Sequence, residues 1–182
     1  MLGSAAVVEA VARKCREYAV QHLVIDPVLV STSGALLLEE SGIDVLKSQL
    51  LPLAELITPN LAESAQLSGM EVRTLADMEQ AVRRLHNLGA RNVLLKGGHL
   101  EGDAVDVFFD GMNLVHFRAE RIDTPNLHGT GCVLSAAIAS HLALGLTLTE
   151  SIASAKDFVS DAIRRGLRLG KGRGPVNPQT SR

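Results

Sequence analysis

A glycine-rich turn that ends in a cysteine, HGTGC, is the stretch of this sequence best suited to chemistry. Gly129, Thr130 and Gly131 come directly before a run of small and apolar residues that predicts a helix. Glycines at a helix start let backbone N–H groups point at one ligand, and the positive end of the helix dipole attracts an anion, above all a phosphate. The same field favours a thiolate, so Cys132 could act as a nucleophile or as a general base.

The same turn also has a purely structural interpretation. Cys132 would then be a small buried apolar residue, and the glycines would only permit close packing. Two standard phosphate-binding motifs are excluded, because Leu134 stands where the dinucleotide fingerprint needs a glycine and the chain has no Gly-Lys-Ser/Thr sequence. An anion site here would therefore be of another kind.

Two charged residues follow short apolar runs. Lys96 comes just before two glycines, and Asp26 lies between an apolar run and a proline. A lysine in this place can reach a transferring phosphate, and an aspartate can orient a metal ion. The structural alternatives are an ordinary surface lysine and an aspartate that shapes a turn.

The stretch TPNLAES also allows two interpretations. Asn60 and Glu63 have the spacing of a capping box, in which the first residue caps a helix and the second reaches back to it. The functional alternative places Glu63 near a metal-bound water at the edge of a sheet.

The hydrophobic pattern predicts the elements that must position these residues. We expect helices over residues 4–18, 34–54 with a break near 41–42, 60–68, 74–90, 131–144 and 149–168, strands over 22–28, 55–58 and 92–96, and a hairpin over 104–122. Helices that alternate with fully apolar strands indicate an α/β fold with a largely parallel sheet. Ligands bind such sheets at the carboxyl ends of the strands, where the charged residues and the glycine turn would meet.

Composition and charge narrow the class of protein. The chain has 182 residues, of which 46% are hydrophobic and 21% charged, which suits one globular domain. The net charge of −2, without a basic stripe among aromatics, argues against a nucleic-acid partner. The chain contains no apolar run long enough to span a membrane, and we do not expect residues 1–20 to be a signal peptide, because Arg13, Lys14 and Arg16 follow the apolar stretch instead of preceding it. Cys15 and Cys132 fit neither a disulfide framework nor a metal site, which favours a reducing compartment. The cytoplasm is the default expectation, and any targeting segment would precede Met1.

Several stretches resemble the hydroxymethylpyrimidine/phosphomethylpyrimidine kinases of thiamine biosynthesis, in the ribokinase-like superfamily. They are MLGSAAVVEAVA (1–12), VIDPVLVSTSGALLL (24–38), LITPNLAESAQLSG (56–69), VLLKGGHL (93–100), AVDVFFDG (104–111), HGTGCVLSAAIASHLALG (128–145) and GPVNP (174–178). They run in family order across nearly the whole chain, and HGTGC separates this family from most relatives, which carry Asp in place of the cysteine. The resemblance implies a ribokinase-like three-layer α/β/α fold around a largely parallel central sheet.

The resemblance also implies an activity that depends on ATP and Mg²⁺. Family members phosphorylate a small-molecule pyrimidine substrate, 4-amino-5-hydroxymethyl-2-methylpyrimidine, and then its monophosphate. Carried over by position, Gly129, Thr130, Gly131 and Cys132 would form the anion hole. Cys132 would be the base that takes the proton of the attacking oxygen.

Four more residues take roles by the same resemblance. Lys96 would contact the ATP phosphates. Asn60 and Glu63 would belong to the motif that holds Mg²⁺ and phosphate through water, and Asp26 would lie close to the metal and the phosphates. Glu63 and Asp26 are therefore the expected metal-binding residues, both acting through water.

Family members carry a further segment before the position that Met1 matches. We therefore expect a partial, N-terminally truncated kinase domain over residues 1–182, with the ATP half of the site and little of the pyrimidine half, and weak or inactive by itself. Residues 170–182 are expected to form a flexible tail, and relatives suggest a homodimer. Two other functions fit the same residues: a pyridoxal-type kinase and a non-catalytic nucleotide-binding α/β module.

Overall fold

A five-stranded sheet forms the centre of the computed structural model, which describes residues 1–30, 35–98, 104–167 and 171–179. In spatial order the strands are β1 (Val24–Ile25), β2 (Leu56–Ile57), β3 (Val93–Leu95), β4 (Ala104–Phe109) and β5 (Leu114–Ala119). The first three pair in parallel, whereas β4 pairs antiparallel with both β3 and β5. Only β4 runs against the other strands of this sheet, so the expected largely parallel sheet with a terminal hairpin is confirmed.

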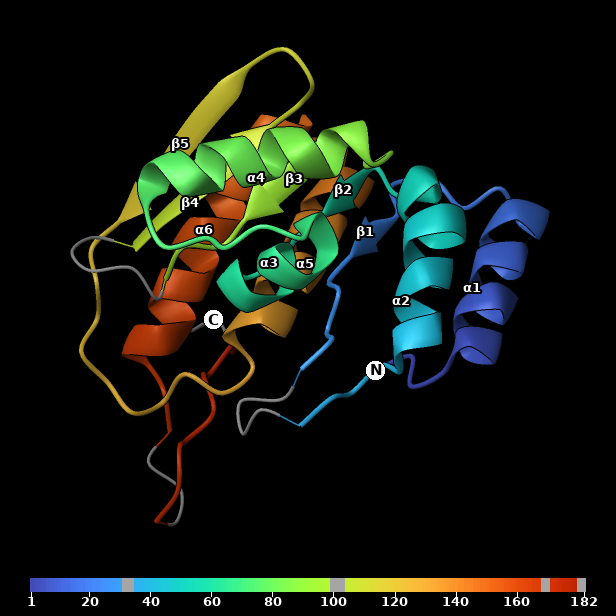
Figure 1. Ribbon diagram of the computed structural model, residues 1–182. Helices are drawn as coiled ribbons and strands as arrows, with labels where there is room; N and C mark the ends of the chain where they lie inside the picture. The colour runs from blue at the N-terminus through green and yellow to red at the C-terminus, as the bar shows by residue number, and fades with distance from the viewer. Residues whose placement is uncertain (31–34, 99–103, 168–170, 180–182) are drawn as a thin grey trace.

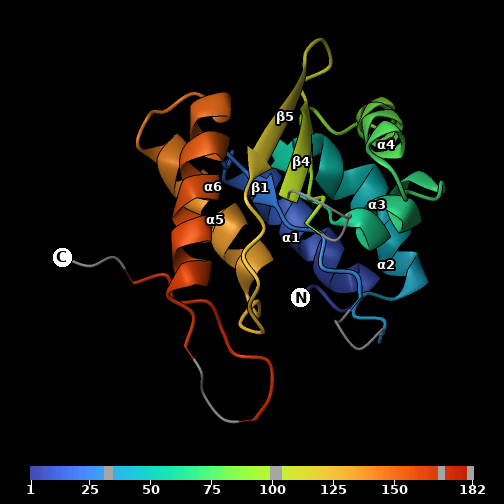
Figure 2. The same ribbon diagram turned by 90° about the vertical axis from the view of Figure 1, so that its left-hand side faces the viewer.

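Helices cover both faces of the sheet and give three layers (Figure 1, Figure 2). They are α1 (Ala5–Glu17), α2 (Glu40–Val45), the short η1 (Leu46–Leu50) and η2 (Leu51–Leu53), α3 (Leu61–Ser68), α4 (Leu75–Asn87), α5 (Thr130–Ala143) and α6 (Leu148–Arg164). On one face α4 packs against β3 and β4, and α1 packs against α2 and η1. On the other face α5 and α6 pack against each other, α5 contacts β1 and α6 contacts β5.

The strands build two cores because their side chains alternate between the two faces. Ile57 and Leu95 belong to the core shared with α1 to α4, whereas Leu56, Leu94 and Phe108 belong to the core shared with α5 and α6. A strand that is buried on both faces needs apolar residues at successive positions. This is why the short continuous apolar runs in the sequence predicted strands correctly.

The predicted helix over residues 34–54 is wrong in its first part. Leu36 and Leu38 form isolated bridges with Val30 and Gly3, and α2 begins only at Glu40. Gly42 therefore lies near the start of this helix and does not break it. An added Cβ at Gly42 would lie 2.5 Å from Cδ1 of Leu38, so close packing explains the glycine.

Part of the C-terminal segment packs on the domain. The backbone of Pro175 pairs with that of His128, just before α5, and Val176 is buried. The N–H of Asn177 donates to the carbonyl of Ala162, near the end of α6, at 2.9 Å. Residues 170 and 180–182 of the expected tail lie outside the described ranges. Within those ranges, none of the helices combines the length and the apolar character that a membrane span needs.

Candidate active site

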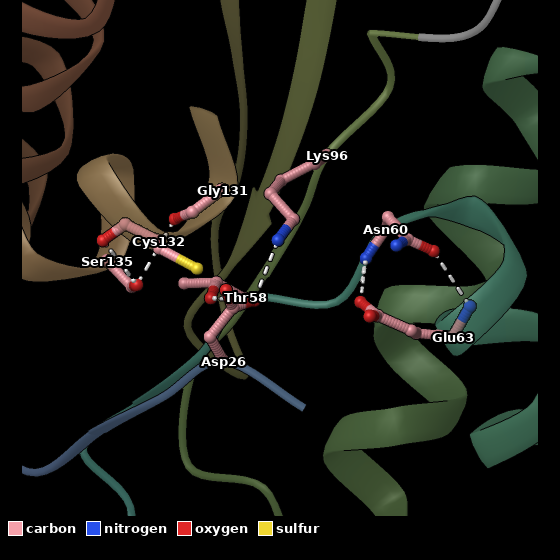
Figure 3. Close-up of polar contacts among 8 residues, drawn as sticks. All are labelled: Asp26, Thr58, Asn60, Glu63, Lys96, Gly131, Cys132 and Ser135. Atoms are coloured by element: carbon pink, nitrogen blue, oxygen red, sulfur yellow. Dashed lines mark hydrogen bonds and ion pairs between the residues drawn. The ribbon is translucent and has the colours of Figure 1, made fainter. Parts of the chain in front are cut away.

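The carboxyl ends of the three parallel strands bring together three polar residues (Figure 3). Asp26 follows β1, Thr58 follows β2 and Lys96 follows β3. The ammonium of Lys96 lies 2.7 Å from Oδ1 of Asp26, and the hydroxyl of Thr58 donates to the same oxygen at 3.2 Å. The predicted convergence at one edge of the sheet is thus confirmed, and it includes Thr58, which follows a predicted strand in the same way.

The Lys96–Asp26 ion pair is largely shielded from solvent. The Lys96 side chain is 16% exposed and the Asp26 side chain 13%. Lys96 is therefore not an ordinary surface lysine, and Asp26 does more than shape a turn. An ammonium carries three N–H donors, so Lys96 can hold Asp26 and a ligand anion together.

The start of α5 approaches this pair closely. Gly129, the residue that caps α5, has a φ of 86°, which favours glycine. An added Cβ at Gly131 would lie 3.1 Å from the Lys96 ammonium and 3.5 Å from Oδ2 of Asp26. The first turn of a helix offers backbone N–H groups that have no partner within the helix. These donors and the Lys96 ammonium therefore lie at one place, which suits an anion.

Cys132 is in the first turn of α5 and is exposed. Its sulfur points toward the ends of β1 and β2 (Figure 3). The interpretation as a buried apolar residue is therefore wrong. The hydroxyl of Ser135 donates to the carbonyls of Gly131 and Cys132 at 3.1 and 3.2 Å, a local contact that the sequence analysis missed.

The capping box at the start of α3 is present as the spacing predicted. The backbone N–H of Asn60 donates to Oε2 of Glu63 at 2.8 Å, and the N–H of Glu63 donates to Oδ1 of Asn60 at 2.9 Å. The N–H of Lys96 donates to the carbonyl of Pro59 at 2.8 Å, directly before the cap. The start of α3 is therefore fixed beside Lys96, and capping and a role at the site are compatible.

Glu63 is a buried carboxyl at this edge, only 3% exposed. Burial raises its pKa above the usual value, while the Asn60 N–H and the charge of Lys96 act in the opposite direction. The negative charge of Asp26 also raises the pKa of Glu63. The Glu63 carboxyl thus interacts electrostatically with both members of the ion pair.

The carboxylates at this edge fit a particular kind of metal binding. Among the described residues, no group of three or more His, Cys, Asp or Glu side chains could enclose an ion. Asp26 and Glu63 supply oxygens, which suit Mg²⁺, an ion that keeps several waters and commonly binds one or two carboxylates together with substrate phosphates. The donor set therefore fits an ion held largely by water and phosphate.

A second buried ion pair lies next to Gly97, the residue that follows Lys96. Asp106 of β4 pairs with Lys156 of α6 and also accepts a hydrogen bond from the N–H of Gly97 at 3.0 Å. No motif in the sequence indicates a role for Asp106 or Lys156. The signal was a lone carboxylate inside the apolar run AVDVFF.

Comparisons with known proteins find similarity along nearly the whole chain. Residues 1–177 match the family model described as phosphomethylpyrimidine kinase. The chain is 49% identical over 178 residues to the thiamine biosynthesis bifunctional protein ThiED of Geobacter sulfurreducens, covering 97% of this chain and 36% of that protein. It is 42% identical over 178 residues to the hydroxymethylpyrimidine/phosphomethylpyrimidine kinase of Synechococcus elongatus, covering 97% and 67%.

A solved structure shows the same fold. The ADP complex of Bacillus subtilis pyridoxal kinase superimposes with a TM-score of 0.89 at 39% identity, covering 97% of this chain and 66% of that one. The expected ribokinase-like α/β/α fold is therefore confirmed. The chain spans about a third of the bifunctional relative and about two thirds of the two kinases.

Proposed function

The chain belongs to the phosphomethylpyrimidine kinase family, and on this premise we propose that it transfers the γ-phosphate of ATP to 4-amino-5-hydroxymethyl-2-methylpyrimidine and then to the resulting monophosphate. One observation carries the proposal: the Lys96–Asp26 ion pair lies close to Gly131, at the glycine-rich start of α5. Phosphoryl transfer depends mostly on positioning and electrostatic stabilisation, and this edge combines a cation with a helix start.

The phosphates of ATP would bind at the start of α5. Gly129, Thr130, Gly131 and Cys132 would form the anion hole. The backbone N–H groups of Gly131 and Cys132 would donate to the phosphates, Gly129 gives the turn its conformation, and the N–H of Thr130 donates to the carbonyl of Leu127 at 3.3 Å. The Lys96 ammonium would contact the phosphates as a point charge. Preorganised donors of this kind stabilise the charge that develops during transfer without needing to reorganise.

Cys132 would be the general base of the transfer. The substrate hydroxyl oxygen forms a bond to the γ-phosphorus, and the bond from that phosphorus to the oxygen of the β-phosphate breaks, so that ADP leaves. The thiolate of Cys132 takes the hydroxyl proton. An exposed thiol in the first turn of α5, with its sulfur toward the strand ends, is placed for this role (Figure 3).

Asp26, Asn60 and Glu63 would support a bound Mg²⁺. Asp26 and Glu63 would hold the ion through water, and Asn60 fixes Glu63 through the capping box. When bound, the ion supplies positive charge that neutralises the phosphates. A cation there would also favour the ionised form of Glu63, which burial disfavours in the free site.

A second substrate has support from a specific observation. The solved structure with a TM-score of 0.89 is that of a pyridoxal kinase. Pyridoxal also presents a hydroxymethyl group on a nitrogen heterocycle. Parallel rate measurements with pyridoxal and with the pyrimidine, under one set of conditions, decide which alcohol this chain prefers. We expect the pyrimidine to have the higher kcat/KM.

The exposed thiol also bears on the cellular setting. Cys132 must stay reduced to act as a base, and thiols stay reduced in the cytoplasm. We therefore propose a cytoplasmic location. The homodimer implied by the family resemblance stays a prediction.

The test is an assay of ATP-dependent phosphorylation by this 182-residue chain, with products identified by mass. We expect both phosphorylated pyrimidines to form, but slowly, because the chain spans only about two thirds of the length of the related kinase. Cys132→Ala should lower kcat about 10²- to 10⁴-fold, the usual contribution of a general base. Cys15→Ala is the matched control, because Cys15 lies in α1 and packs against the core, and it should keep the wild-type rate.

Two results would contradict the proposal in different ways. A folded chain that binds ATP but forms no product would be a non-catalytic nucleotide-binding module. A Cys132→Ala chain that keeps the full rate would show that another group takes the proton.

A further inference from the structure

We propose that Asp106 and Lys156 are positioning residues for Lys96, because their buried ion pair fixes the backbone on which the Lys96 side chain stands. The inference rests on the proposed function, in which Lys96 contacts the ATP phosphates. Neither Asp106 nor Lys156 touches the Lys96–Asp26 pair directly in the described contacts. They would act through the main chain at Gly97.

The ion pair is buried and aimed at the backbone. Each of the two side chains is only 11% exposed, and the Lys156 ammonium lies 2.5 Å from Oδ2 of Asp106. The other oxygen, Oδ1, accepts the hydrogen bond from the N–H of Gly97 at 3.0 Å. One carboxylate thus joins helix α6 to the residue that follows Lys96.

The register of the sheet explains this placement. Leu94 pairs with Phe108 and Leu95 with Val107. Asp106 has the same alternation as Phe108, whose side chain lies in the core with α5 and α6, so the Asp106 side chain also faces α6. It comes opposite the point where β3 ends and the main chain turns toward the site.

Gly97 is pressed against β4 at the same point. An added Cβ would lie 2.1 Å from the carbonyl oxygen of Val105 and 2.8 Å from the terminal methyl of Met78. A backbone N–H in so close a space needs an acceptor, because a buried donor without a partner is costly. Asp106 supplies that acceptor as a carboxylate, which gives a charge-assisted bond.

The backbone around Lys96 is therefore held on several sides. The N–H of Lys96 bonds to Pro59 at the end of β2, the N–H of Gly97 bonds to Asp106 of β4, and the carbonyl of Gly98 accepts from Arg121 at 2.7 Å. Lysine is flexible, so the position of its ammonium depends on a fixed main chain. Its ammonium lies 2.7 Å from Asp26 on a side chain that is mostly buried.

Stability alone gives a weak reason for this ion pair. Burying two charges costs desolvation energy, and replacement of such pairs by apolar residues of similar size is often neutral or stabilising. Removal of one partner alone leaves an uncompensated buried charge. Both residues must therefore be replaced together in any test, so that loss of folding is not mistaken for loss of positioning.

The test compares two double variants. Asp106→Asn/Lys156→Gln keeps an acceptor for the Gly97 N–H without a net charge. Asp106→Leu/Lys156→Met keeps a similar side-chain volume but offers no acceptor to the Gly97 N–H. If this variant does not fold, Asp106→Ala/Lys156→Met is used in its place. Thermal unfolding checks that each variant is folded. Hydrogen exchange of the Gly97 amide and chemical labelling of the Lys96 amine are then measured without nucleotide, and ATP binding by calorimetry.

We expect the apolar variant Asp106→Leu/Lys156→Met to lose protection of the Gly97 amide from exchange and to show more labelling of the Lys96 amine. Its affinity for ATP should fall about 10- to 100-fold, the range that a small misplacement in a site can cost. The amide pair should stay within about twofold of wild type on each measure, which is rescue by the conservative variant. In a Lys96→Met background the apolar pair should weaken ATP binding no further, because the effect passes through Lys96.

The proposal is overturned if the folded apolar pair keeps Gly97 protection and wild-type Lys96 labelling. It is also overturned if the apolar pair weakens ATP binding equally in the Lys96→Met background, which would show a general structural effect. If the wild-type chain binds no ATP, the proposed function fails. The exchange and labelling results, which need no nucleotide, then still decide the positioning role.

Discussion

Three helices in the described part of the chain begin with the same capping box, and they differ in where the carboxylate lies. The box of α3 uses Asn60 and Glu63, whereas α4 and α6 use Asp77 and Glu150 at the equivalent third position. Glu63 is 3% exposed, and burial raises its pKa. Glu150 is exposed, and hydrogen bonds from Thr147 lower its pKa; hydrogen bonds from the Arg73 and Thr74 backbone lower that of Asp77.

The three boxes make the same capping hydrogen bonds, but only the carboxylate of the α3 box is buried. A cap stabilises a helix best with an ionised carboxylate near the helix start, and α4 and α6 meet this condition. The box of α3 has the same hydrogen bonds, but its carboxylate is buried beside the Lys96–Asp26 pair, where ionisation is disfavoured. Capping alone gives no reason for that placement, whereas the proposed binding of ATP phosphates and Mg²⁺ at this edge would.

Within this comparison, the largest expected effect comes from removal of Lys96, whose charge acts on the Glu63 carboxyl of the α3 box. Lys96→Met should lower kcat/KM for ATP about 10²- to 10³-fold, since a preorganised group at the transferred phosphate is lost. The pKa of Glu63 should rise further, because the charge of Lys96 lowers it in the wild type. Kinetics and a carboxyl NMR titration measure the two effects.

Lys14→Met is the control for this change. Lys14 lies on the surface of α1 and pairs with Glu17. It should leave kcat/KM unchanged. Equal losses of kcat/KM in Lys96→Met and Lys14→Met would show that Lys96 has no particular role in the reaction.

Glu63→Gln against Glu150→Gln tests the comparison directly. Glutamine can keep either capping box. Glu63→Gln should lower the rate of phosphorylation about 10- to 100-fold, as loss of an outer partner of a metal site does, and it should not destabilise the chain at neutral pH. Glu150→Gln should keep the rate. A wild-type rate for Glu63→Gln would show that the carboxylate of the α3 box serves only to cap the helix.

Asn60→Ala against Thr147→Ala separates stability from activity. Each loses a side-chain cap and should lower the free energy of unfolding by about 1 kcal/mol, measured by urea denaturation. Only Asn60→Ala should also change the KM for ATP, because Pro59 before this cap bonds to the N–H of Lys96. An unchanged KM in both variants would show that the cap does not support Lys96.

The smallest expected effect is on the pH dependence of stability, to which Glu63 of the α3 box and Glu150 of the α6 box should contribute with opposite signs. The raised pKa of Glu63 means that the folded chain binds its proton more tightly than the unfolded chain, so this group lowers stability as pH rises from its usual value of 4.5 to the raised one. The lowered pKa of Glu150 stabilises the folded chain above the usual value, and this contribution is lost as pH falls through the lowered one.

Unfolding curves over this pH range measure the difference. The stability of Glu63→Gln relative to wild type should increase as pH rises. That of Glu150→Gln relative to wild type should decrease over the same range. Two curves of the same slope would show that burial does not reverse the behaviour of Glu63.

Local patterns predicted much of this molecule from its sequence. The short apolar runs gave the strands, because a strand buried on both faces needs apolar residues at successive positions. The spacing of Asn60 and Glu63 gave the cap, because a capping box joins residues three apart. The sequence also predicted that Asp26, Lys96 and the turn before Cys132 meet at one edge of the sheet.

Contacts between distant segments account for what the sequence could not provide. Lys96 and Asp26 are 70 residues apart, and Lys156 and Asp106 are 50 apart, so no local spacing predicts either ion pair. The burial of Glu63 depends on the elements that pack around α3. The first part of the helix predicted over 34–54 failed because bridges to other segments replaced the helical conformation that its leucines suggested.

The most direct measurement is a ¹³C NMR titration of the Glu63 and Glu150 carboxyl groups in one sample, with and without ATP and Mg²⁺. We expect a midpoint above the usual range for Glu63 and below it for Glu150, and a shift on nucleotide addition at Glu63 alone. Two midpoints below the usual range, with neither signal moved by nucleotide, would contradict this prediction.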